Sequence, residues 1–172
     1  MKKYISLSLL MVSITLFGCQ SPAPVENTEK QQPVENNQEA LNPEMHIALV
    51  DLEDNGQAGD LLGCGDSLVF EDQPLGIGQD ALTESLNFLL AINTQNYGTY
   101  YNSLGNSQLV VDSIVESGTN VTVNLSGTIS LGGVCDNPRF EEQITRTVEE
   151  NTTLTPQIFL NGQTLEDALS LA

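Results

Sequence analysis

The chain contains three cysteines, and the segment before the first one restricts how the other two can be used. Lys2 and Lys3 form a short positive region, and residues 4–17, YISLSLLMVSITLF, form an apolar stretch. A stretch of this length is typical of a secretory signal and is too short to span a bilayer comfortably. The sequence therefore predicts export to a compartment in which disulfides persist.

The leader ends in LFGC, which resembles the bacterial lipobox, with Leu16 at position −3, Gly18 at −1 and Cys19 at +1. In this interpretation residues 1–18 are a lipoprotein signal peptide, and the Cys19 thiol is acylated. We therefore expect a lipid-anchored protein on the extracytoplasmic face of the cell membrane. In a host with two membranes, Gln20 after the acylated residue suggests the outer membrane. The alternatives are ordinary signal cleavage and a buried leader helix.

Acylation of Cys19 leaves Cys64 and Cys135, and two cysteines allow a single intramolecular bridge. These two residues lie 71 positions apart. The chain-entropy model gives a bridge that closes such a loop about 4 kcal/mol of stability, less any strain. We predict a structural disulfide. A redox-active pair is disfavoured because CxxC is absent, and two thiols alone make a poor metal site.

The composition is strongly acidic, with a formal net charge of −18 and five basic residues. Such a surface repels nucleic-acid phosphates and anionic lipid heads, so we expect no nucleic-acid partner. Residues 20–42 are rich in Pro, Gln, Asn and Glu and lack apolar periodicity. We therefore predict that residues 19–42 form a disordered tether in front of a folded domain.

The folded domain is predicted to span residues 43–172. Apolar and polar residues alternate from Val121 to Leu131, which is typical of a half-buried strand, with a kink at Gly127. An apolar stripe at helical spacing begins at Leu82. The expected elements are strands 45–52 and 67–72, helix 79–92, strands 108–116 and 120–131, helix 138–150, strand 155–162 and helix 164–170. This order predicts an α+β fold with two main helices packed on one face of a mixed β-sheet.

The stretch CDNPRF predicts the start of the second helix. Asn137 suits the N-cap, and Pro138 suits the first helical position, where a missing N–H costs nothing. Arg139 then lies in the first turn, which is the unfavourable end of the helix dipole for a cation. A Cys64–Cys135 bridge would bring Asp66 close to Arg139 as a partner.

Several stretches, taken together, are similar to one known family. They are CGDSLV, the helix ALTESLNFLL, the hairpin LVVDSIVESGTNVTVNLSG, LGGVCDNPRFEEQITRTVEE and PQIFLNG. This arrangement resembles the GerMN domain, the sporulation and spore-germination domain often found on bacterial lipoproteins, over about residues 45–165. The resemblance implies a non-enzymatic α+β module that acts in cell-wall, envelope or spore-assembly contexts through protein or peptidoglycan contacts.

We therefore expect a membrane-tethered, extracytoplasmic module that binds cell-wall or envelope components. A structural scaffold subunit of an envelope protein complex is the alternative, and a wall hydrolase is a less favoured one. His46 is the sole histidine, so a Ser–His–Asp or Cys–His site could use no other. We predict no catalytic residue, no cofactor and no metal ligand.

The polar loop before the predicted hairpin contains the best binding candidates, Tyr97, Tyr100 and Tyr101. Amphipathic rings on a polar loop can stack on sugars or contact a partner protein, and the alternative is that one or two of them pack on the core. Arg139 and Asp66 complete the candidate ligand-binding set.

The stretch DLEDNG partly matches a Ca²⁺-binding loop, with Asp51, Glu53 and Asn55 at positions 1, 3 and 5. Position 12 is Leu62, where such a loop needs a bidentate Glu. We interpret the stretch as a tight acidic turn.

Overall fold

The computed structural model describes residues 43–170, so the predicted signal peptide, Cys19 and the tether lie outside the described residues. The strands are β1 (Glu44–Asp51), β2 (Asp60–Leu61), β3 (Ser67–Pro74), β4 (Asn96–Tyr97), β5 (Tyr100–Tyr101), β6 (Gln108–Ser117), β7 (Asn120–Thr128), β8 (Thr155–Leu160) and β9 (Gln163–Thr164). The helices are the 3₁₀ turn η1 (Gly63–Gly65), α1 (Ala81–Ala91), α2 (Asp136–Asn151) and α3 (Leu165–Ser170).

The strands form two sheets. One is antiparallel, in the order β2-β3-β1-β5-β4, and the other is mixed, in the order β6-β7-β8-β9, because β7 and β8 run parallel. β1 occupies the centre of its sheet, and Ile47, Ala48, Leu49 and Val50 are fully buried in it. A strand that is apolar on both faces is expected at such a position. The predicted α+β class is confirmed, with two sheets in place of one.

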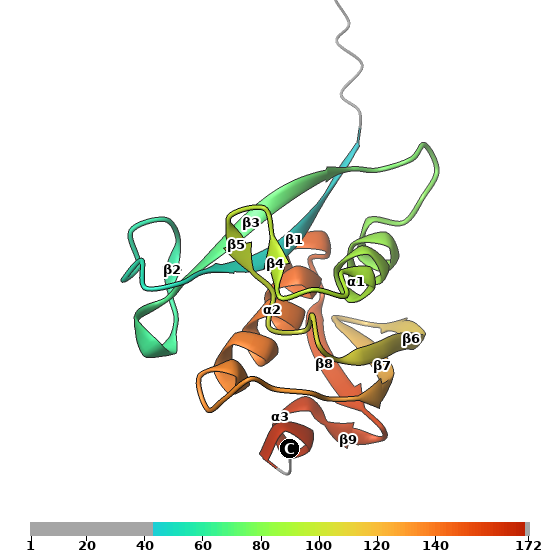
Figure 1. Ribbon diagram of the computed structural model, residues 1–172. Helices are drawn as coiled ribbons and strands as arrows, with labels where there is room; N and C mark the ends of the chain where they lie inside the picture. The colour runs from blue at the N-terminus through green and yellow to red at the C-terminus, as the bar shows by residue number, and fades with distance from the viewer. Residues whose placement is uncertain (1–42, 171–172) are drawn as a thin grey trace, which may run out of the picture. The chain divides into compact units, whose positions relative to one another are not determined.

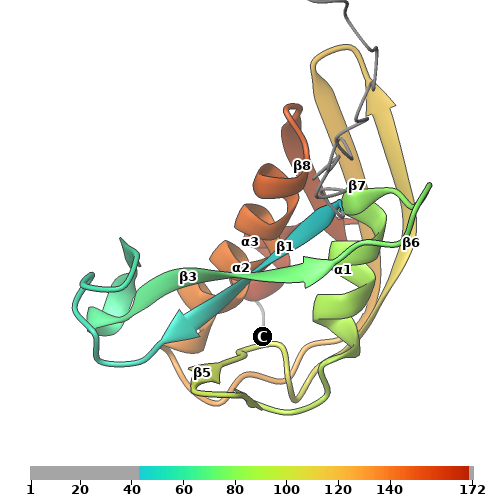
Figure 2. The same cartoon turned by 90° about the horizontal axis from the view of Figure 1, so that it is seen from above.

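The two main helices are confirmed as well, and they connect the sheets. α1 contacts β1 and β6, α2 contacts β1 and β8, and the helices contact each other. Figure 1 shows β1 and β3 on one side of the helices and β6, β7 and β8 on the other. Figure 2 shows the β6–β7 hairpin running beside α1.

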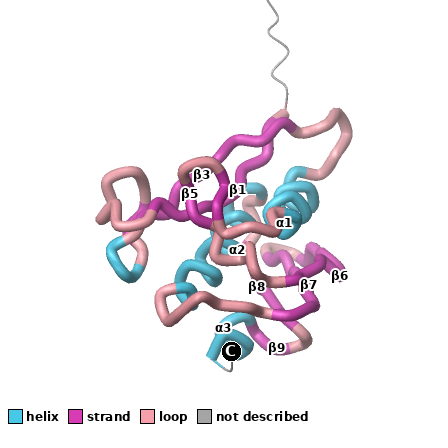
Figure 3. The backbone as a smooth tube through the Cα atoms, viewed as in Figure 1, coloured by secondary structure: helices cyan, strands magenta, loops and turns pink. Residues whose placement is uncertain are grey.

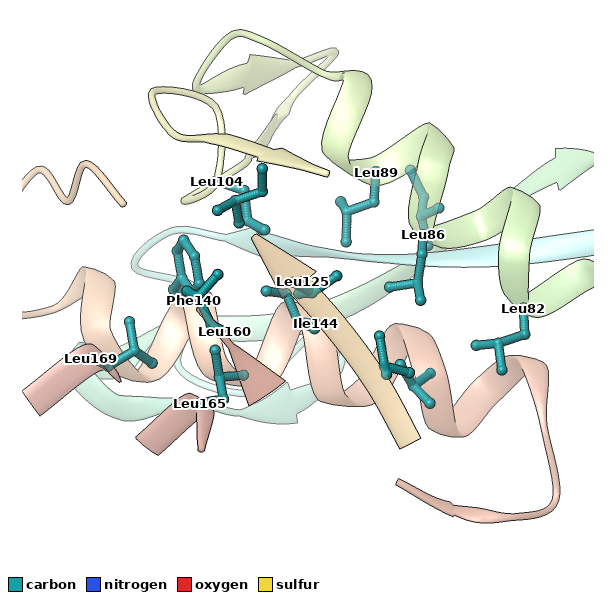
Figure 4. Packing of buried hydrophobic residues seen from close by; sticks show 14 of the residues in the cluster. Leu82, Leu86, Leu89, Leu104, Leu125, Phe140, Ile144, Leu160, Leu165 and Leu169 are labelled. Atoms are coloured by element: carbon teal, nitrogen blue, oxygen red, sulfur yellow. The ribbon is translucent and has the colours of Figure 1, made fainter. Parts of the chain in front are cut away.

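One hydrophobic core unites these elements (Figure 4). The predicted helical stripes face into it: Leu82, Leu86 and Leu89 on α1 are at most 3% exposed. From α2, β7, β8 and α3 the core receives Phe140, Ile144, Val148, Val121, Val123, Leu125, Leu160, Leu165 and Leu169. Burial of apolar area at this density is the main force holding the two sheets to the helices.

The predicted kink at Gly127 lies near the end of β7. Gly127 has φ of +136°, and a Cβ atom there would collide with the main-chain oxygen of Gln108. The Asn161 side chain accepts from the Gly127 N–H at 3.0 Å and donates to its C=O at 2.9 Å. β7 ends at Thr128, so the predicted continuation to Leu131 is wrong: beyond the kink the chain leaves the sheet.

The predicted start of the second helix is also wrong by two residues. α2 begins at Asp136, Cys135 occupies the N-cap position, and Asn137 is inside the helix. The Asp136 carboxylate turns back and accepts from the Gly132 N–H at 2.6 Å, which fixes the entry of the chain. Pro138 still lies in the first turn, where N–H groups have no partner within the helix.

Candidate functional site

The Cys64–Cys135 disulfide joins η1 to the start of α2, and it confirms the predicted pair. The two Cα atoms are 6.0 Å apart. Cys64 and Gly65 both adopt positive φ, at +65° and +78°. The Gly65 C=O accepts from the Asn55 N–H at 2.8 Å. The bridge therefore ties the loop after β1, as well as η1, to the helix.

Beside the disulfide, Arg139 lies between two buried carboxylates. Its Nε donates to Asp66 Oδ2 at 2.7 Å, and its Nη1 donates to Asp136 Oδ1 at 3.0 Å. Asp66 is fully buried and Asp136 is 2% exposed. The predicted proximity of Asp66 and Arg139 is confirmed. Two carboxylates offset the unfavourable position of a cation in the first turn of a helix.

Tyr101 extends this network. Its hydroxyl donates to the Asp136 carboxylate at 2.9 Å and accepts from Gln95 Nε2 at 2.7 Å. The Arg139 guanidinium lies 5.3 Å from the centre of the Tyr101 ring, within cation–π range. Burial and then the hydrogen bond and charge of Asp136 raise the pKa of Tyr101 to about 12, because all three disfavour a phenolate.

A pocket of about 500 Å³ opens onto this network. Its lining is Gln95, Tyr101, Gly132, Gly133, Val134, Cys135, Asp136 and Arg139. Half of these residues belong to the connection between β7 and α2, which Figure 3 shows as a long loop. We call this cavity the disulfide pocket. It presents an amide, a carboxylate, a guanidinium, a phenol and glycine main chain, which together can donate to and accept from a polar ligand.

The three candidate tyrosines separate into two groups. Tyr97 and Tyr100 pack against the hydrophobic core, and the ring of Tyr97 meets that of Phe88 edge-on at 6.3 Å. Tyr101 alone among them lines the disulfide pocket. Of the other two candidates, Arg139 lines the pocket and Asp66 supports Arg139 from the buried side.

Asp136, Gln95 and Gly132 belong to the site but were absent from the predicted set. The role of Asp136 could have been predicted from the sequence, because it stands three residues before Arg139 and residues at i and i+3 share one helix face. The roles of Gln95 and Gly132 could not, because only the tertiary fold brings their segments to Tyr101 and Asp136.

The other residues considered from the sequence, those of the acidic turn and His46, make contacts that stabilise the local structure. Glu53 and Asn55 adopt positive φ in a tight turn, and Asp54 accepts from the Ala58 N–H and the Ser67 hydroxyl. His46 Nδ1 lies 2.8 Å from Asp72 Oδ1. Within residues 43–170, no three acidic, His or Cys side chains are grouped in a way that would hold a metal ion. Nor does any helix there combine the length and apolar character needed to cross a membrane.

Replacement of Arg139 by Gln is expected to lower the free energy of unfolding by about 3–5 kcal/mol, because it leaves two buried carboxylates without their cation. Arg146→Gln is the matched control. Arg146 pairs with Glu149 and Asp60 at a more exposed site, so its loss is expected to cost less than about 1 kcal/mol. Urea unfolding of both variants measures the difference, and equal losses would contradict this account.

The raised pKa of Tyr101 predicts a pH-dependent contribution to stability. In the unfolded chain the phenol titrates near 10.0, and in the folded domain it titrates at about 12. The contribution is therefore complete below pH 10 and is lost as the pH rises from 10 to about 12, because the unfolded state loses its proton first. Tyr101→Phe is expected to make the decline of stability across this window shallower. Urea unfolding at several pH values compares the two slopes, and identical slopes would refute the prediction.

No protein-family model matches the chain, and no curated protein matches it. Among solved structures, the first GerMN domain of the sporulation protein GerM from Bacillus subtilis is similar, with a TM-score of 0.49 and 11% sequence identity. The match covers 71% of this chain and 85% of that chain. This is the family that the sequence stretches resemble. At this identity and score the similarity carries no argument about fold or function.

Proposed function

We propose that the domain is a non-enzymatic binding module, held at the extracytoplasmic face of a cell membrane by acylated Cys19, that recognises a cell-wall glycan through the disulfide pocket. The observation that carries this proposal is the position of the Cys64–Cys135 bridge. It stabilises one wall of a polar pocket and belongs to the chemistry of exported proteins.

The chemistry of the pocket favours a neutral, hydroxyl-rich ligand. Gln95 offers an amide and Arg139 a guanidinium, which are planar groups suited to paired hydrogen bonds with sugar hydroxyls, and Asp136 holds the guanidinium in place. Polyanions are disfavoured because two carboxylates surround the single guanidinium and the whole chain carries a net charge of −18.

Binding rather than catalysis is supported by how the side chains at the site are used. Both oxygens of Asp136 accept hydrogen bonds, from Tyr101, Gly132 and Arg139. Both oxygens of Asp66 accept as well, from Arg139 and the Glu53 N–H. Carboxylates held in this way position neighbouring groups, whereas a general base must be able to reach a proton of the substrate.

Steric blocking of the pocket tests the binding proposal. A Cβ atom at Gly133 meets nothing within 4 Å, so Gly133→Trp adds bulk at the pocket wall without disturbing the core. Ile77→Trp, at a position 97% exposed and outside the pocket lining, is the matched control. In sedimentation with purified cell walls, Gly133→Trp is expected to lower the bound fraction about tenfold and Ile77→Trp to leave it unchanged. Equal sedimentation of all three proteins, or none for the unmodified one, would reject wall binding through this pocket.

The anchor is tested separately on the full chain, expressed with its leader in a bacterium that processes lipoproteins. Intact-mass spectrometry of the membrane-extracted protein is expected to give a chain that starts at Cys19 and carries acyl groups. Cys19→Ser is the control and is expected to lose both the added mass and the membrane association. A Cys19 without lipid, or one still joined to residues 1–18, would refute the anchor.

A further inference from the structure

A second pocket, of about 350 Å³, lies on a different part of the domain and shares no lining residue with the disulfide pocket. It runs between the middle of α2, the strand β8 and the start of α3. Its lining is Glu141, Thr145, Pro156, Gln157, Ile158, Phe159, Thr164, Leu165 and Glu166. We call it the β8 groove. Its walls combine apolar side chains with two carboxylates.

Within residues 43–170, the groove follows a sheet edge that has no partner strand over most of its length. On one side β8 pairs with β7 along its whole length, from Thr155 to Leu160. On the other side β9 pairs only with Phe159 and Leu160. Among the described residues, the edge of β8 from Thr155 to Ile158 is therefore open, and most of this stretch lines the groove.

The register identifies the main-chain groups that face this open edge. The Thr155 N–H donates to the Thr119 C=O, and the Asn161 N–H donates to the Leu125 C=O. Residues of a strand alternate between its two neighbours, so the odd-numbered residues of β8 face β7 and the even-numbered ones face outward. Pro156 has no N–H, so it presents its C=O, and Ile158 presents its N–H. One residue of an added strand can bond to both groups.

The charge of the groove indicates which kind of peptide strand could bind along the open edge. The pKa of Glu141 is raised, first by burial and then by the negative charges of Glu142 and Glu166, because both effects disfavour the ionised carboxylate. The arginines of the described domain are engaged elsewhere, Arg139 with Asp66 and Asp136, and Arg146 with Asp60 and Glu149. A cation at the β8 groove must therefore come from outside the described domain. Residues 20–42 of this chain are a poor source, since they hold four Glu and one Lys.

We propose that the β8 groove binds an extended segment of a partner protein, which adds to the open edge of β8 as a strand and places a basic side chain between Glu141 and Glu166. The apolar side chains of the segment pack on Ile158 and Leu165. Strand addition of this kind obtains affinity from main-chain hydrogen bonds and specificity from side-chain pockets. Pro156 limits the edge to a short ladder, which suits a peptide better than a second copy of the domain. The inference does not depend on glycan binding at the disulfide pocket.

A fluorescein-labelled peptide, Lys-Val-Lys-Val-Lys-Val-Lys, is the probe, and fluorescence anisotropy with the unmodified full chain measures its binding. An analogue N-methylated on its three central residues keeps the charge and loses the ability to form a ladder. We expect saturable binding of the first peptide and binding at least about tenfold weaker for the analogue. Failure of the first peptide to bind, or equal affinity for the two, would overturn the proposal.

Two charge-matched variants test the place of binding. Glu141→Gln combined with Glu166→Gln is expected to weaken binding about tenfold. Glu44→Gln combined with Glu116→Gln removes the same charge from exposed positions outside the groove, and it is expected to change the affinity less than twofold. Equal losses in both would mean diffuse attraction to an acidic protein and would overturn the proposal. So would a dimer in sedimentation velocity that the peptide dissociates, since the edge would then bind a second copy.

Discussion

A guanidinium held between two buried carboxylates is the interaction on which this structure depends most. Arg139 contacts Asp66 from the loop before β3 and Asp136 from its own helix. A buried ion of either sign is costly alone, so the loop and the helix must stay together for all three charges to be satisfied. The disulfide one residue before Asp136 holds the same two segments covalently. Covalent and ionic contacts thus reinforce one junction between the antiparallel sheet and α2.

This junction also explains why different parts of α2 contribute to different surfaces of the domain. Its first turn supplies Asp136 and Arg139 to the disulfide pocket, its buried face supplies Phe140 and Ile144 to the core, and Glu141 borders the β8 groove. A helix that contacts both sheets and is fixed at its start presents these groups in constant relative positions. The helix thereby borders both of the surfaces for which we propose a ligand.

Much of this arrangement could be predicted from the sequence, for physical reasons. Strong apolar periodicity predicted α1, α2 and the β6–β7 hairpin. The expected export of the chain predicted the Cys64–Cys135 disulfide, and the disulfide predicted that Asp66 and Arg139 are close. Predictions from local sequence preferences were wrong where tertiary contacts determine the structure. Asn137 had the better N-cap chemistry, but Asp136 begins the helix because Gly132, Tyr101 and Arg139 all bond to its carboxylate. The two-residue strands β4 and β5 are too short to carry a period, so Tyr97 and Tyr100 could not be told from Tyr101.

The position of the bridge also determines how the domain tolerates a cut. The chain from Cys64 to Cys135 is a covalently closed ring that includes α1 and the β6–β7 hairpin. A protease that cleaves within the ring, for example at the loop containing Ile77, leaves a single molecule whose two pieces stay joined through sulfur. Core residues on the two pieces, such as Leu49 before the cut and Leu86 after it, belong to one hydrophobic cluster. In a reducing environment the same nick would release one piece from the other.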